Sequence, residues 1–129
     1  MSNPILSGFN NQFSEFIEDI LRIFPNDKDL ILSKNMITMV RKGNPKLLIK
    51  IWKEHISDVY NEKIEEGDIK FFIEKDYKQD VKVLGEADKV VQTIERLREP
   101  IRNMDEVNQQ ACMKYIQNLT KLSQMYFSN

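Results

Sequence analysis

The sequence predicts an all-α protein, a single-domain bundle of five to six helices spanning residues 1–129. Three observations support this fold class. Apolar residues recur at spacings of three and four, no run alternates with period two over the length of a strand, and proline, glycine and capping residues separate the periodic stretches. A chain of 129 residues suits one domain and is too short for two of ordinary size.

The first three helices are predicted from the N-terminal half of the chain. Apolar residues on one helical face run from Phe9 to Phe24, and Pro25 ends that helix. Asp27 is the expected N-cap of a second helix that ends at Gly43. The dipeptide at 44–45, asparagine followed by proline, is typical of a helix start, so a third helix is expected from there through Ile56.

Three more helices are predicted in the C-terminal half. The Gly-Asp pair at 67–68 precedes a short apolar helix that includes Phe72. A fifth helix follows Gly85, and Pro100 is expected to bend or end it. Asp105 is the expected cap of the last helix, whose apolar positions continue to Tyr126. Only residues 79–85 could be briefly extended.

Catalytic and metal-binding motifs are not found in the sequence. The chain has one cysteine and one histidine, Cys112 and His55, which cannot form a usual zinc site. Cys112 lies on the apolar stripe of the last helix and is expected to be a buried small hydrophobe, while His55 is expected to cap a helix or face water. The predictions are therefore no catalytic residue, no metal, no cofactor and no small-molecule ligand. Carboxylates from separate helices could still converge in space, which leaves an enzyme as an open alternative.

The composition favours an intracellular protein. A single cysteine rules out an internal disulfide and suits a reducing compartment. Acidic and basic residues interrupt the first 25 positions, which is unlike a signal peptide, so the protein is not expected to be secreted. The apolar runs are much shorter than a membrane span, and no membrane insertion is expected.

A basic ridge is the first candidate interaction site. Between residues 34 and 53 there are six basic residues and no acidic one. The ridge consists of Arg41, Lys42, Lys46, Lys50 and Lys53. It could bind the phosphates of a nucleic acid or an acidic protein, although the following residues 54–68 carry six acids and the whole chain has a net charge of -1. The alternative is a solvated charged face, with Trp52 pointing into the core.

An apolar edge of the last helix is the second candidate. This helix carries more large apolar side chains than one narrow core stripe requires. The candidate interface consists of Met113, Met125, Tyr126 and Phe127. It could meet a partner or a second copy of the chain, because apolar surface is costly to leave in water. The alternative is that this helix is the centre of the bundle and is surrounded on most sides.

Several tracts resemble small helical proteins encoded by large nucleocytoplasmic DNA viruses of protists and algae. These tracts are FNNQFSEFIEDILRIFPNDKDL, KGNPKLLIKIWKEHI, GDIKFFIEKDY and KYIQNLTKLSQMY. The resemblance implies a viral origin and a place in the host cytoplasm, at the viral factory, and in the virion. The expected function is that of a non-enzymatic interaction or structural protein, a minor capsid-associated or assembly component whose partners are other virion proteins or copies of itself. The alternative function is a nucleic-acid-associated factor that uses the basic ridge.

Overall fold

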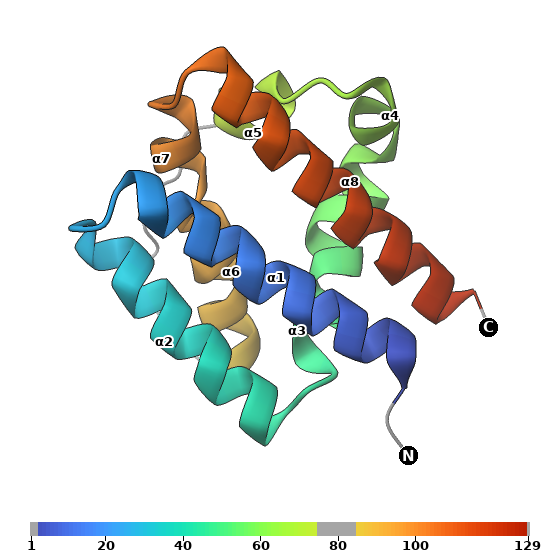
Figure 1. Cartoon of the computed structure of the whole chain (residues 1–129). Coiled ribbons are helices and arrows are strands. Elements are labelled where there is room, and N and C mark those ends of the chain that lie inside the picture. The colour runs from blue at the N-terminus through green and yellow to red at the C-terminus, as the bar shows by residue number, and fades with distance from the viewer. Residues whose placement is uncertain (1–2, 75–84, 129) are drawn as a thin grey trace.

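The computed structural model describes residues 3–74 and 85–128, and these residues form helices and turns with no β-strand (Figure 1). The predicted all-α bundle is confirmed. The elements are α1 (Pro4–Ile23), α2 (Lys28–Gly43), α3 (Leu47–Trp52), η1 (Lys53–Ser57), α4 (Asp58–Glu66), α5 (Lys70–Ile73), α6 (Glu86–Arg96), α7 (Arg98–Arg102) and α8 (Glu106–Phe127). Of the stretch predicted to be extended, residues 79–84 lie outside the described residues.

Helix α1 begins five residues before the predicted start. Its N-cap is Asn3, whose Oδ1 accepts hydrogen bonds from the backbone N–H groups of Ile5 and Leu6 at 2.9 and 3.3 Å. Pro4 occupies the first helical position, where its missing N–H needs no partner. The helix ends at Ile23, just before Pro25, as predicted.

Helix α2 has the predicted bounds and the predicted cap. Oδ1 of Asp27 accepts from the backbone N–H groups of Asp29 and Leu30 at 3.0 and 3.2 Å. Its C-terminal residue is Gly43, and α1 and α2 pack side by side (Figure 1). The third helix starts later than predicted, because Asn44 closes α2 and α3 begins only at Leu47.

The third helix is also longer than predicted. It does not end at Ile56 but continues from α3 through a π-helical turn, η1, into α4. We call the continuous helix formed by α3, η1 and α4 the rod. It has a kink at Tyr60, whose φ of -119° and ψ of 22° are not helical. It ends at Gly67, which adopts the left-handed conformation (φ 73°) that a residue without a Cβ reaches without strain.

The fifth helix bends near Pro100, as predicted. The break between α6 and α7 falls at Leu97, and Pro100 lies in the first turn of α7, where no N–H is required. Asp105 caps α8 as predicted, with its Oδ1 accepting from the backbone N–H of Asn108 at 2.8 Å.

Helix α8 is at the centre of the packing. It contacts α1 over much of its length and also α3, η1, α4 and α7 (Figure 1). Trp52 is fully buried, its ring meets those of Phe9 and Phe13 edge-on, and its Nε1–H donates to Oγ1 of Thr120 on α8 at 3.1 Å. This confirms that Trp52 belongs to the core. None of the helices formed by the described residues has the length and hydropathy that crossing a membrane requires.

Candidate functional site

The predicted basic ridge is divided between internal and outward-facing side chains. Arg41 is held against α1, since its guanidinium donates to Oγ of Ser14 at 3.0 Å and to Oδ1 of Asn11 at 2.8 Å. Lys53 is paired with the carboxylate of Asp58. Arg41 thus links α2 to α1, and Lys53 links η1 to the start of α4.

The other three ridge residues face solvent. Lys42 ends α2, Lys46 precedes α3 and Lys50 lies within α3, and all three are exposed. Within the part of the chain that the structure describes, their ammonium groups form no hydrogen bond or ion pair. Three of the five predicted residues thus remain available to a partner.

The predicted apolar interface on α8 is only partly at the surface. Met113 is buried in the core, so its inclusion in an interface was wrong. Tyr126 is half-buried and packs against the core, whereas Met125 and Phe127 are 46% and 47% exposed. Most of α8 is the central helix of the bundle, which was the alternative interpretation, and of the four predicted interface residues only Met125 and Phe127, in its last turn, are exposed.

A larger apolar surface lies on α2, where the sequence analysis had placed no interface. Leu32 and Met39 are 56% and 69% exposed, and Met36 between them is partly buried. The three residues have the spacing i, i+4, i+7, so they share one side of the helix, opposite the buried Leu30 and Ile37. The spacing was readable in the sequence, but nothing in it distinguishes an outward apolar stripe from an inward one.

Lysines flank this stripe at both ends. Lys28 precedes Leu32 by four residues and Lys42 follows Met39 by three, and both lysines are exposed. We call the surface formed by Lys28, Leu32, Asn35, Met39 and Lys42 the α2 face. It combines an apolar centre with a cation at each end.

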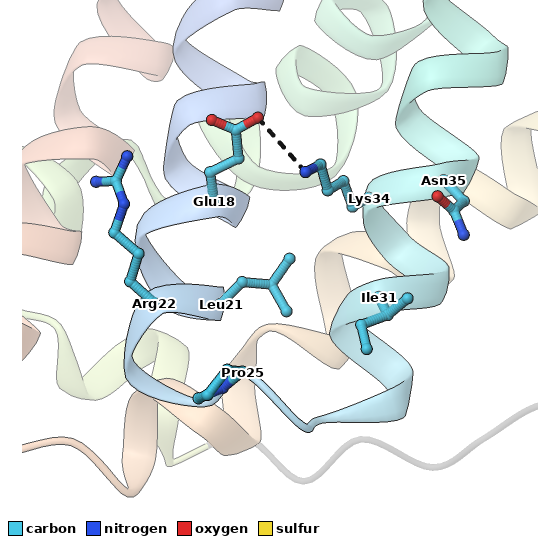
Figure 2. A pocket seen from close by; sticks show the side chains of 7 residues that line it. All are labelled: Glu18, Leu21, Arg22, Pro25, Ile31, Lys34 and Asn35. Atoms are coloured by element: carbon cyan, nitrogen blue, oxygen red, sulfur yellow. Dashed lines mark ion pairs between the residues drawn. The ribbon is translucent and has the colours of Figure 1, made fainter.

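An open groove runs beside the α2 face, between α1 and α2 (Figure 2). Its volume is about 650 Å³. Leu21 of α1 and Ile31 of α2 project toward it from opposite sides, and above them Lys34 and Glu18 form an ion pair across it, with Nζ and Oε1 3.8 Å apart (Figure 2). The groove extends the apolar surface of α2 toward α1.

A buried polar cluster joins η1, α5, α6 and α7. Arg98 is almost fully buried; its guanidinium donates to both carboxylate oxygens of Glu95 and, at 2.6 Å, to the backbone carbonyl of Phe72. The guanidinium also lies 4.4 Å from the centre of the Phe72 ring. Nε2–H of His55 donates to Glu95 at 2.8 Å. His55 therefore bonds a buried carboxylate, which the sequence analysis did not predict.

The contacts of Glu95 shift its acidity. Burial by itself raises the pKa of a carboxyl group, but the hydrogen bonds from His55 and Arg98, together with their charges, outweigh burial and lower the pKa of Glu95 from 4.5 to about 2. Glu95 is thus a permanently ionised partner of Arg98 near neutral pH. The hydrogen bonds of the cluster connect η1, α5, α6 and α7.

A second cavity, of about 280 Å³, lies between α1 and α8 beside Asp19, Cys112 and Tyr115. Burial raises the pKa of the Cys112 thiol to about 12, with the charge of Asp19 adding to the effect. Burial and the hydrogen bond that its hydroxyl donates to Asp19 raise the pKa of Tyr115 to about 12 as well. Both groups stay protonated at neutral pH, so neither supplies an anionic nucleophile there.

No three side chains of the types that bind metals gather into a possible ligand set within residues 3–74 and 85–128. Comparison of the chain with protein-family models, with curated proteins and with solved structures found no match.

Proposed function

We propose that this chain is a non-enzymatic interaction protein and that the α2 face is its main docking surface. The observation that carries the proposal is the exposure of Leu32 and Met39, two turns apart on the side of α2 that faces away from the core. Clustered apolar side chains with a charged rim are typical of protein-binding surfaces, because covering them removes apolar area from water.

A photoreactive amino acid placed at Met39 tests the proposal in the cells that make the protein. Discrete protein adducts are expected on irradiation, and Leu32→Asp should abolish them because it puts a charge in the centre of the face. The matched control is the same photoreactive group at Val107, an exposed apolar residue at the start of α8. Equal adducts from both positions, or none from position 39, would contradict the proposal.

The resemblance to proteins of large DNA viruses extends this proposal to a role as a minor virion or assembly component. That extension rests on the sequence tracts alone. Mass spectrometry of purified particles tests it, since a chain made in infected cells and missing from the particles is not a virion component.

A nucleic-acid-associated role is the second candidate, favoured by the exposure of Lys42, Lys46 and Lys50. Binding to phosphates releases counterions, so the affinity for DNA or RNA should fall steeply with salt. Anisotropy titrations at two salt concentrations measure this dependence, and Lys46→Glu with Lys50→Glu should weaken binding. Lys114→Glu, an exposed lysine on α8, is the matched control. Undetectable binding at low salt would end this candidate.

A further inference from the structure

The charges of the chain are segregated along its sequence. Residues 28–50, which comprise α2 and most of α3, contain six basic side chains and one acidic side chain. Residues 54–68, which comprise most of η1 and all of α4, contain six acidic side chains and one lysine. The two segments therefore carry equal and opposite charge, which a net charge of -1 for the whole chain conceals.

The fold places the basic helix α2 and the acidic helix α4 on opposite sides of the molecule, while α3, η1 and α4 follow one another directly. Helices α2 and α4 lie far apart, with α1 and α8 between them (Figure 1). The charges of α2 and those of α4 are therefore too far apart to form ion pairs with one another within one copy. Most of the charges on α2 are positive and most of those on α4 are negative, so the two helices present fields of opposite sign to the surroundings.

The acidic side is built on the outward surface of α4. Glu62 and Glu66, which follow the kink at Tyr60, are four residues apart on one side of the helix and exposed. Asp58 and Val59, which precede the kink, are exposed as well, Val59 to 61%. We call these four residues the α4 face. Asp58 is paired with Lys53, whereas Glu62 and Glu66 form no ion pair with any residue of 3–74 or 85–128.

Further apolar surface adjoins the α4 face. Asn61, two residues after Val59, accepts a hydrogen bond from Nε2 of Gln124 on α8 at 2.9 Å. The next residue of α8 is Met125, so the half-exposed end of α8 lies along the same side of the molecule as α4. The acidic side, like the basic side, thus combines charges with exposed apolar side chains.

We propose that the α2 face of one copy binds the α4 face of a second copy, head to tail. This inference rests on the proposed function and names the partner. The lysines at the ends of the α2 face, Lys28 and Lys42, would approach Glu62 and Glu66, while Leu32 and Met39 would cover Val59. Both halves of the contact belong to one chain, so they are present at equal concentration, and their charges are opposite in sign.

The arrangement has a geometric consequence. The two faces differ and lie on opposite sides, so the contact is heterologous, and each added copy leaves one α2 face and one α4 face uncovered. Association should therefore continue beyond a dimer as the concentration rises. It should also weaken as salt screens the charges.

Sedimentation velocity over a range of protein concentrations tests the proposal. At an ionic strength of about 0.02 M the average mass should rise steadily with concentration, and at about 0.5 M it should return toward that of one chain. Two charge reversals separate the faces: Lys28→Glu with Lys42→Glu on α2, and Glu62→Lys with Glu66→Lys on α4. Each should weaken self-association by about tenfold or more, because like charges then meet. Circular dichroism checks that both variants keep their helices.

The decisive measurement is the equimolar mixture of the two variants. The first variant keeps its acidic α4 face and the second keeps its basic α2 face, so the mixture should associate although neither variant does so alone. The matched control reverses Lys89 and Lys114, two exposed lysines outside both faces, and should associate like the wild type. A mixture that stays monomeric, or variants that associate as well as the wild type, would overturn the head-to-tail contact.

The outcome at low salt also separates this inference from the proposed function. A wild type that remains monomeric, while the photoreactive group at position 39 captures a different protein, overturns self-association and leaves the docking function standing. A monomer that captures nothing overturns both. Adducts with the mass of two chains support both.

Discussion

The charged cluster around Arg98 and the charged α2 face use the same kinds of side chain in opposite ways. Arg98 is buried and directs its guanidinium at Glu95 and at a backbone carbonyl, so its charge serves the fold. Lys28 and Lys42 are exposed, and neither ammonium group bonds any residue in the described part of the chain. Removing a buried charge leaves its partners unpaired and destabilises the fold, whereas a charge left in solvent is available for binding.

The largest expected effect distinguishes these two kinds of charge directly. Arg98→Met should lower the free energy of unfolding by about 3–5 kcal/mol, because it leaves the buried Glu95 carboxylate with His55 as its one remaining side-chain donor and removes the donor to the Phe72 carbonyl. Lys42→Met, the matched control, should change it by less than about 0.5 kcal/mol. Urea unfolding followed by circular dichroism measures both, and a small loss for Arg98→Met would contradict the structural role of the cluster.

The double variant Glu95→Leu with Arg98→Met sharpens the same test. Replacing both charges removes the unpaired carboxylate, so much of the stability lost in Arg98→Met should return. A double variant as unstable as the single one would mean that the loss comes from packing and not from the unpaired charge.

The next largest expected effect is a loss of stability at acid pH, caused by protonation of Glu95. The folded-state pKa of Glu95, about 2, lies below the value of 4.5 expected in the unfolded chain. A depressed carboxyl pKa contributes stability that is fully present above the unfolded value and is lost as the pH falls through the folded value. The contribution is about 3 kcal/mol, lost between about pH 5 and pH 2. Urea unfolding at several pH values should show a smaller pH slope for Glu95→Gln in this window, and an unchanged slope would contradict the assignment.

His55 makes a smaller contribution, because its ring is partly exposed. His55→Ala removes one donor from the Glu95 carboxylate and should cost about 1 kcal/mol. The pKa of Glu95 should rise toward its ordinary value, which a carbon NMR titration of the labelled carboxyl group can follow. Val59→Ala, an exposed site on the same rod, is the control that should leave this pKa unchanged.

The smallest expected effect lies on the α2 face. Leu32→Asp and Met39→Asp should each change the free energy of unfolding of the monomer by less than about 0.5 kcal/mol, because both side chains already face water. Urea unfolding at low protein concentration and moderate salt measures this without contributions from association. A large loss would show that the stripe is part of the core, and the docking proposal would lose its basis.

The helices were predictable wherever the sequence carries a local signal. Asp27 and Asp105 cap helices as expected, because an N-cap depends only on its own side chain and the next three residues. The two Asn-Pro pairs show the limit of such signals. The pair at residues 3–4 starts α1, whereas in the pair at residues 44–45 the asparagine closes α2. Asn44 follows directly on Gly43, the last residue of α2, so it caps the end of α2 and cannot also start α3.

The candidate site was less predictable, because exposure depends on contacts far apart in sequence. In the sequence, Arg41 and Lys53 look the same as the other ridge residues. In the fold, Arg41 bonds two residues of α1 and Lys53 pairs with Asp58, one turn further along. Met113 differs from Met125 only in the helices that pack against it. Arg98 lies four residues after Ile94, within an apolar stripe, which marks it as buried; its partners at Phe72 and Glu95 follow only from the tertiary fold.

The π-helical turn at Lys53–Ser57 determines how α4, which follows it, is rotated about the axis of the rod. A wide turn holds about one residue more than an α-helical turn, and each residue of an α-helix advances the azimuth by about 100°. Removing a single residue there would leave the charge nearly the same and swing α4 by more than a quarter of a revolution about the rod axis. The number of residues in η1 thus determines the angle between the α2 face and the α4 face. An insertion or deletion within these five residues would change that angle and leave the residues of both faces unchanged.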